Sequence, residues 1–250
     1  MKHIFLLLSF SFCLFFSLLA QNPYVELSYP WLNQQQVKEN KIKSIMLATM
    51  NDNGNQEKQL LLKFDNTGNL VSEESQMGFR YTNVLLYDSD GLLSMVVSKD
   101  GESADSTDYY YDSENRFWTA VSYKLNESER MWDLRIAKYF YDSQNRLTSY
   151  VTESGFGKKN TVTEDFVPAT TDTTVVSRQN NTLKLQSPDL IWSWIYSDKG
   201  LLLRSETWIV LYNMTETSLY DYDQNGRLVL ITWEQTGSST KTFVTYEFYE

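Results

Sequence analysis

The sequence predicts an all-β protein, an antiparallel meander of repeated β-hairpins with about 14 to 16 strands, in a curled sheet or an open or closed barrel. Three observations predict it. A short turn signature recurs six times, most copies lie about 25 residues apart, and the segments between them carry apolar residues on both faces. This spacing leaves room for two strands and two connections in each unit. A sheet of that width twists and tends to curl or to close on itself.

The chain begins with a segment that has the features of a secretory leader. Lys2 lies ahead of the apolar run Ile4–Leu19, and Ala20 precedes Gln21 as a small residue at the expected cut. The run is short for a membrane helix, which needs about 20 apolar residues. We therefore expect residues 1–20 to be a signal peptide and the protein to be exported to the periplasm, the cell surface or the medium.

Composition argues against several classes of function. The single histidine and the single cysteine, His3 and Cys13, both lie in the expected leader. The mature chain would therefore have no disulfide, no zinc site of the usual kind and no Cys or His nucleophile pair. The 22 basic against 32 acidic residues give a net charge of −10, which disfavours nucleic acid as a partner. We expect no cofactor and no enzymatic activity.

A hydrolase that uses two carboxylates is the enzymatic alternative. The sequence distinguishes no catalytic pair, because the neighbours of Glu73, Glu74, Glu206 and Glu234 resemble those of other surface acids. Asp221–Gly226 matches the opening of a calcium-binding loop, but Thr232 stands where that loop needs a glutamate. We therefore expect neither catalytic residues nor a metal site.

Residues 21–41 form an N-terminal segment that differs from the rest of the chain. The stretch 30–40 shows no alternation of apolar and polar residues, and it predicts a short helix with Trp31, Leu32 and Val37 facing inward. Lys43–Thr49 then predicts the first strand, followed by a turn at 51–54. We expect the β-hairpin repeat domain to cover residues 42–250.

The turn signature has a chemical explanation. It starts with an aromatic residue, has Asp or Ser at its second position and Gly or Asn at its fifth, and ends with an apolar residue at its seventh. Asp bonds the backbone at the start of a type I turn, and Gly or Asn adopts the left-handed conformation at its end. Such a turn closes a bulged hairpin, in which the aromatic residue faces the closing apolar residue. The copies begin at Phe64, Tyr87, Tyr111, Tyr141, Tyr196 and Tyr222.

One interval is irregular. Tyr141 and Tyr196 are 55 residues apart, about twice the usual spacing, so one unit has degenerated between them. We expect its turn near Phe166–Pro168, with a longer loop or an irregular strand over residues 169–176.

The pattern Tyr-Asp-x-x-Gly/Asn-Arg-Leu resembles the YD repeat of RHS-type proteins, over about residues 42–250. In large members of that family, many repeats spiral into a hollow β-shell around a cargo, and the repeat is often described as carbohydrate-binding. The resemblance implies β-hairpin architecture and an exported setting. With only six or seven units, it does not imply encapsulation of a cargo.

Aromatic residues supply the candidate binding site. Tyrosine and tryptophan combine a large apolar ring with a polar group, and exposed rings on a sheet can stack on sugars. Trp192 and Trp194 share one face by the two-residue period. The competing interpretation is that these rings form the core, since strands favour aromatic residues. The candidate ligand-binding residues are Trp118, Trp132, Trp192, Trp194, Trp208 and Trp233.

These observations favour an exported, non-enzymatic binding or interaction module, with a glycan or another cell-surface polymer as the expected ligand. One alternative is a structural surface protein that contacts an envelope protein. Another is an outer-membrane-type β-barrel, which the strand lengths and alternating short and long connections would suit. Charged residues on both faces of several strands argue against membrane insertion.

Overall fold

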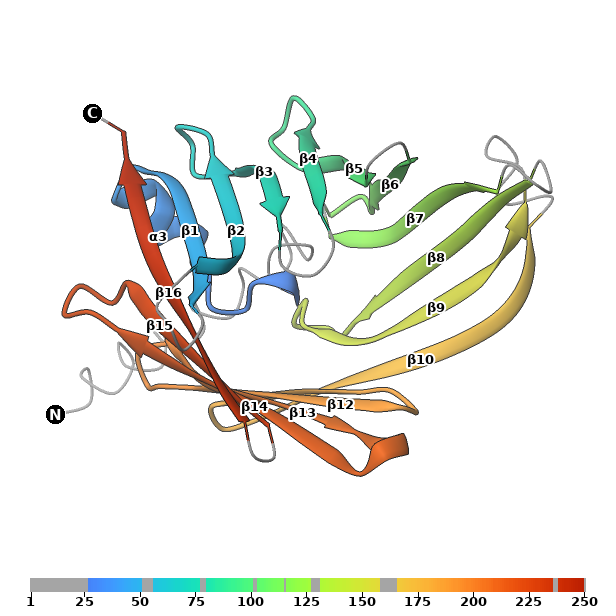
Figure 1. Cartoon of the computed structure of the whole chain (residues 1–250). Coiled ribbons are helices and arrows are strands. Elements are labelled where there is room, and N and C mark those ends of the chain that lie inside the picture. The colour runs from blue at the N-terminus through green and yellow to red at the C-terminus, as the bar shows by residue number, and fades with distance from the viewer. Residues whose placement is uncertain are drawn as a thin grey trace, which may run out of the picture.

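The protein is a closed barrel of 16 antiparallel strands, in which every strand pairs with its sequence neighbours and β1 pairs with β16 (Figure 1). The computed structural model describes residues 27–50, 56–76, 80–100, 103–114, 116–126, 131–157, 166–235 and 238–249. The predicted all-β meander is therefore confirmed, in its closed form.

The strands vary in length from five to 13 residues. The first eight are β1 (Ile42–Met50), β2 (Gln56–Phe64), β3 (Leu70–Ser75), β4 (Tyr81–Tyr87), β5 (Leu93–Asp100), β6 (Ser103–Tyr111), β7 (Phe117–Asn126) and β8 (Met131–Tyr141). The others are β9 (Leu147–Gly157), β10 (Val167–Gln179), β11 (Thr182–Gln186), β12 (Leu190–Tyr196), β13 (Leu202–Ile209), β14 (Met214–Tyr222), β15 (Leu228–Gln235) and β16 (Ser238–Phe248).

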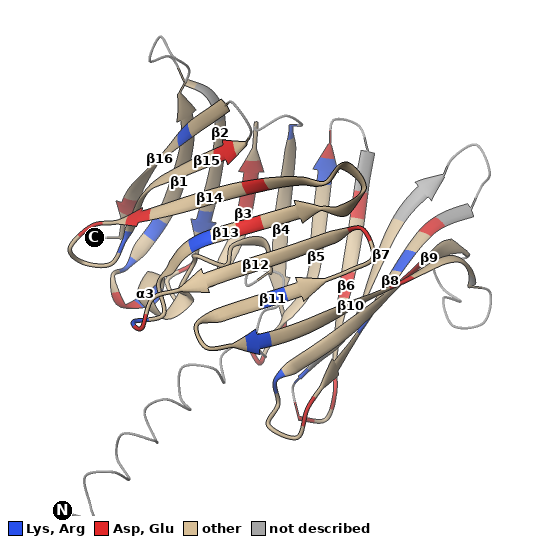
Figure 2. Ribbon diagram, turned by 90° about the horizontal axis from the view of Figure 1, so that it is seen from below, with Lys and Arg blue, Asp and Glu red and all other residues tan. Residues whose placement is uncertain are grey.

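The alternation of connections gives the barrel two different ends. We call one the turn end: it holds the six signature turns, the β10–β11 turn, the start of β1 and the end of β16. The opposite end, which we call the loop end, holds the remaining connections, including 187–189 and 210–213. Figure 1 looks towards the loop end, and Figure 2 shows both ends from the side.

The signature turns adopt the predicted geometry. In each copy the register shifts at the aromatic residue, which then pairs with the closing apolar residue, as in Tyr87 with Leu93 and Tyr222 with Leu228. The fifth residue has a positive φ wherever it is described, for example +81° at Gly91 and +59° at Asn145. The second residue bonds two backbone N–H groups of its own turn; Asp142 accepts from Gln144 N at 2.8 Å and from Arg146 N at 3.0 Å.

The degenerate unit lies elsewhere than predicted. We expected a turn at Phe166–Pro168 and an irregular segment after it, but β10 runs through this region as a strand of 13 residues with a bulge between Pro168 and Thr170. The hairpin closes instead at Asn180–Asn181, where Asn180 has a φ of +52°. The β-branched run Thr173–Val176 favours a continued strand, and asparagine tolerates the left-handed conformation.

A short helix precedes the barrel, as the sequence predicts. α3 (Gln34–Glu39) starts at Asn33, whose side chain accepts from the backbone N–H of Gln36 at 3.1 Å. It ends at Asn40, and Lys41 then takes a φ of +52° to turn the chain into β1. Val37 is the buried residue of the helix.

Candidate functional site: the barrel interior

The turn end of the barrel interior is packed with apolar side chains. Leu62, Leu70 and Leu93 have no exposed surface, and Leu228 is 2 % exposed. Burial of one such side chain stabilises a fold by about 1.5–3 kcal/mol. This packed layer lies behind the signature turns and holds the wall strands together.

The N-terminal segment closes this end. Tyr29 and Val37 belong to the same buried cluster as the leucines, and Trp31 contacts both this cluster and a second one around Trp194. The side chain of Gln36 donates to the carbonyl oxygens of Asn225 and Gly226, at 3.3 and 3.2 Å. The space left between the segment and β1, β14, β15 and β16 is only about 20 Å³, which is about the room for one water molecule.

A ladder of tyrosine hydroxyls connects successive repeats. Tyr87 Oη donates to the carbonyl of Leu70 at 2.8 Å, and Tyr111 Oη to that of Leu93 at 3.0 Å. Each acceptor is the closing apolar residue of the preceding copy, and Tyr222 and Tyr246 repeat the contact with Leu202 and Leu228. In the degenerate unit, Arg178 donates to Leu147 O instead. The sequence analysis did not predict that these hydroxyls bond the preceding copy. The available signal was the preference for Tyr over Phe at the first position of the turn signature.

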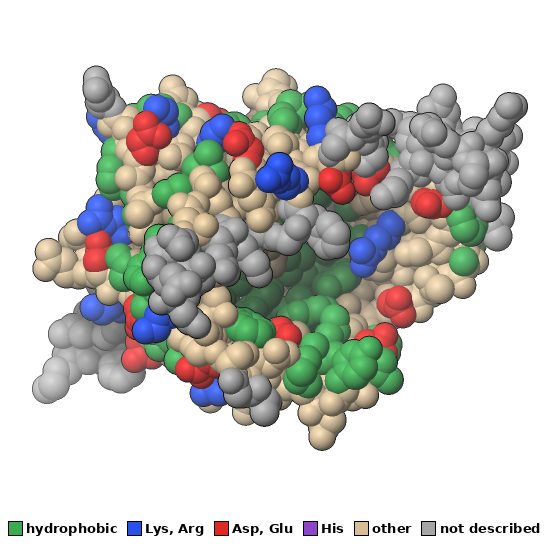
Figure 3. All heavy atoms as spheres, in the orientation of Figure 1, with side chains coloured by type: hydrophobic (Ala, Val, Ile, Leu, Met, Phe, Trp, Pro, Cys, Tyr) green, Lys and Arg blue, Asp and Glu red, His purple; other side chains and the backbone are tan. Residues whose placement is uncertain are grey.

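The interior wall towards the loop end carries polar side chains on several strands. One row of paired interior residues crosses β2 to β6 and consists of Leu62, Glu73, Asn83, Ser98 and Asp105. Only the first side chain of this row is apolar, and the other four are polar or charged. Other interior positions on the far wall carry Thr207 and Glu216, which pair across β13 and β14. Figure 3 looks onto this end and shows a hollow with hydrophobic side chains deep inside and charged side chains near its rim.

Glu73 is a carboxylate almost completely buried in this wall, with 2 % exposure. It accepts hydrogen bonds from Tyr81 Oη and from Asn83 Nδ2, the latter at 3.3 Å. Burial, together with the bond to Glu73 and its charge, raises the pKa of Tyr81 to about 12. Tyr81 therefore remains a hydrogen-bond donor at neutral pH.

The six candidate tryptophans do not form one platform. Trp194 pairs with Leu183 and packs in the interior. Residues paired with it on successive strands lead to Trp233, which therefore lies on the same face of the sheet. Trp192 shares the face of Trp194, as predicted. Trp118 and Trp208 are instead exposed, at 58 % and 41 %. The side chain of Trp132 lies outside the described residues. Their ligand-binding role stays a prediction.

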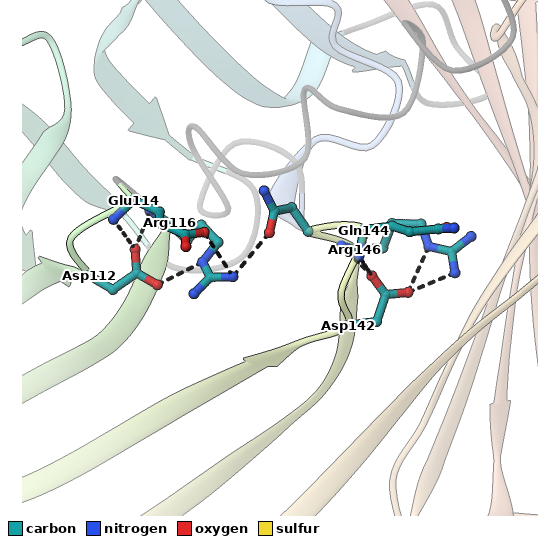
Figure 4. A network of polar contacts seen from close by, with 7 residues as sticks. Asp112, Glu114, Arg116, Asp142, Gln144 and Arg146 are labelled. Carbon is teal, nitrogen blue, oxygen red and sulfur yellow. Dashed lines mark hydrogen bonds and ion pairs between the residues drawn. The ribbon is translucent and has the colours of Figure 1, made fainter.

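Trp118 lines a separate hollow of about 430 Å³ at the turn end, between β6, β7 and β8. Arg116 lies beside this hollow. Its Nε donates to Asp112 at 2.7 Å and an Nη donates to Asn145 at 3.0 Å (Figure 4). Its guanidinium also lies 5.7 Å from the ring centre of Tyr141. The guanidinium of Arg116 is therefore already engaged by protein partners. The side chains of the hollow that a ligand could contact are mainly aromatic. The other lining residues are Tyr111, Tyr139 and Phe140.

The pairing of Asp with Arg inside a turn is a second feature that sequence reasoning missed. Arg146 donates to Asp142 Oδ2 from Nε at 2.8 Å, and Arg227 does so to Asp223 at 2.7 Å. Bonds from the backbone and side chain of Arg146 hold the pKa of Asp142 at about 2. For Asp223, burial acts to raise the pKa, but the same bonds from Arg227 outweigh it and lower the pKa. The recurring Arg at the sixth position was the available signal.

The acids considered for catalysis are dispersed. Glu73 faces the interior, whereas Glu74 pairs with Lys63 and Glu206 with Arg204 on the outer face. Asp223, in the calcium-like motif, is occupied by its own turn. Within the described ranges, no group of three or more acidic, histidine or cysteine side chains is placed to hold a metal ion.

Charged residues occur along many of the strands (Figure 2), and some of them form ion pairs on the outer face of the wall. Lys138 pairs with Glu153 at 2.9 Å and Arg204 with Glu206 at 2.5 Å. Exposed aromatic side chains occur near both ends of the wall, such as Phe140 at the turn end and Trp208 at the loop end. In the part of the chain that the structure describes, no helix is long and apolar enough to cross a membrane.

Comparison with known proteins identifies a similar fold but no protein family. No protein-family model matches the chain, and no curated protein sequence matches it. The fold is similar to that of a porin-like protein from Bacteroides uniformis ATCC 8492, with a TM-score of 0.53 and 10 % identity, over 83 % of this chain and 97 % of that one. This likeness concerns the fold: the chain shares a closed, antiparallel β-barrel architecture with that protein.

Proposed function

We propose that the protein is an exported, non-enzymatic β-barrel of the cell envelope, blind at its turn end, which takes a small polar solute into its loop-end half. The observation that carries this proposal is the contrast within the interior. Trp31, Val37 and the buried leucines fill the turn end, whereas interior positions nearer the loop end include the polar residues Glu73, Asn83 and Glu216. Figure 3 shows a hollow at that end. The partly exposed carboxylate of Glu216 on this wall favours a solute with amine or hydroxyl donors.

Several features support the envelope setting. The even number of strands and their antiparallel meander order are features of bacterial outer-membrane barrels. Exposed aromatics near both ends of the wall also occur in such barrels. The neighbour from Bacteroides uniformis is described as porin-like.

The outer wall nevertheless favours water over lipid as its surroundings. Lys138, Glu153, Arg204 and Glu206 lie on it as ion pairs, and a Lys or Arg facing the middle of a bilayer costs about 2–4 kcal/mol. β11 has five residues, a length of about 17 Å, against an apolar band of about 25 Å in membrane barrels. We therefore place the barrel in the aqueous envelope and keep the membrane-inserted barrel as a second candidate.

The first test is extraction and purification of residues 21–250 without detergent. The proposal predicts a monodisperse protein with a β-rich circular dichroism spectrum in buffer, and no ion conductance when it is added to planar bilayers. A protein that leaves the envelope only in detergent, or that gives discrete conductance steps, would establish the second candidate.

The second test concerns the solute. Tryptophan fluorescence is followed against sugars, polyols and small amines, with Trp192→Phe as the interior variant and Trp118→Phe as the outer control. We expect a saturable change that persists in the Trp118 variant and is lost or reduced in the Trp192 variant. A response carried by Trp118 alone would move the binding site to the outer hollow and restore the stacking-site prediction, and no response from a folded protein would reject solute binding.

A further inference from the structure

The connection between β13 and β14 exposes a compact group of apolar side chains at the loop end, which we call the apolar tip. Trp208 and Val210 are 41 % and 39 % exposed, while Leu211 and Tyr212 are 77 % and 71 % exposed. The hairpin lies along the lower edge in Figure 1, and hydrophobic side chains gather there in Figure 3. These are large exposed fractions for side chains that normally contribute to cores.

The backbone holds these side chains outward. Val210–Tyr212 form the short helical turn η3, and Asn213 ends it with a φ of +47° and a bond from its N–H to Val210 O at 3.2 Å. The N–H of Val210 donates to Asp189 O in the neighbouring connection at 2.9 Å, which fixes the turn to β12. The tip is therefore a built projection of the wall, held by backbone bonds on both sides.

Its chemistry selects the partner. No charged residue occurs from Thr207 to Thr215, although the whole chain has a net charge of −10. A lipid surface deforms around a projecting apolar group and buries its side chains at the headgroup–acyl boundary. Tryptophan and tyrosine are the residues enriched at the boundary between headgroups and acyl chains. The acidic chain would be repelled by anionic lipids, so a zwitterionic surface fits best.

We propose that the apolar tip docks the barrel reversibly on a zwitterionic lipid surface, with Leu211 and Tyr212 entering the boundary between headgroups and acyl chains. The proposal is independent of the solute and of barrel insertion. A docked barrel leaves the membrane when two side chains of the tip are changed, whereas an inserted barrel does not.

The experiment measures co-sedimentation of residues 21–250 with phosphatidylcholine vesicles. It compares the wild-type chain with Leu211→Ser/Tyr212→Ser, which leaves the charge unchanged. Leu203→Ser is the matched control, because Leu203 is a 45 % exposed leucine at the other end of the same strand. We expect the double variant to lower the partition coefficient at least tenfold, the control to bind like wild type, and phosphatidylglycerol in the vesicles to weaken binding at low salt.

A second readout locates the contact. Brominated phosphatidylcholine should quench part of the tryptophan fluorescence, and Trp208→Phe should remove that part. Wild-type protein that stays in the supernatant at excess lipid, or a double variant that binds like wild type, would overturn the proposal. Dimerisation in buffer that the double variant abolishes would overturn it too, because it would make the tip an interface between two copies.

Discussion

The two ends of the barrel are built on different principles. At the turn end, the same contacts recur from copy to copy: an acid or serine bonds its own turn, a left-handed residue closes it, and a tyrosine hydroxyl reaches the preceding copy. At the loop end, the two fully described connections, 187–189 and 210–213, differ from each other, and a row of interior side chains changes from apolar to polar across β2 to β4. The comparison indicates that repetition encodes the scaffold, while the features on which our proposals rest, the polar interior wall and the apolar tip, lie outside the repeated turns.

The largest expected difference between the ends concerns the core. Leu93→Ala removes a side chain with no exposure in the turn-end layer and should lower the free energy of unfolding by about 2–5 kcal/mol. Ile209→Ala removes a half-buried side chain at the loop end and should cost about 1 kcal/mol. Urea unfolding of both variants measures the difference, and equal losses would show that the two ends contribute alike.

A pair of glycines tests the closure of the turn end. Gly68 and Gly91 occupy the same position in neighbouring copies, with φ of +88° and +81°. Gly91→Ala should cost about 1–2 kcal/mol from backbone strain alone, since a Cβ there meets open space. Gly68→Ala should cost more, because its Cβ would lie 2.8 Å from Lys38 Cβ on α3. Similar unfolding midpoints would mean that α3 does not rest on this turn.

The tyrosine ladder predicts a smaller effect. Tyr111→Phe removes the donor to Leu93 O and leaves a partly buried carbonyl without it, so unfolding should become easier by about 1 kcal/mol. Tyr212→Phe, at an exposed position of the loop end, is the control and should leave the urea midpoint unchanged. A Tyr111 variant as stable as wild type would show that the tyrosine ladder does not stabilise the fold.

The smallest effect is a pH dependence at the turn end. Asp142 has a folded pKa of about 2, below the unfolded value of about 3.9. Its charge therefore stabilises the fold fully above about pH 4, and this contribution disappears as pH falls towards about 2. We expect the stability difference between wild type and Asp142→Asn to be constant near neutral pH and to shrink below about pH 4. Asp90→Asn, in the β4–β5 turn of the same end, controls for the lost charge.

The parts of the fold that local rules determine could be predicted. Asp142 and Asn145 identify a turn by their own backbone chemistry, and the six-residue spacing fixes which residues pair across it. The sequence did not predict whether the sheet is open or closes into a barrel. Closure depends on the pairing of β1 with β16, and these strands lie at opposite ends of the sequence. The turn at Asn180–Asn181 escaped prediction because its pattern differs from the other copies.

The candidate site was less predictable for a geometric reason. The six tryptophans lie at different positions relative to the turn signature, and positions one residue apart face opposite sides of a strand. Trp118 therefore lies exposed on the outer wall, whereas Trp192 and Trp194 line the interior. The resemblance to YD repeats stays a prediction, because no family model matches the chain.

The most direct test of the account is a disulfide across the seam that closes the barrel. Ala48 on β1 faces Phe243 on β16, and Leu230 lies one strand further along. The chain's one cysteine is Cys13, in the expected leader, so residues 21–250 offer a background without other thiols. The account predicts that Ala48→Cys/Phe243→Cys oxidises within the monomer, because paired Cα atoms lie within disulfide range, and that Ala48→Cys/Leu230→Cys does not. A folded monomer in which the first pair stays reduced would contradict the closed barrel.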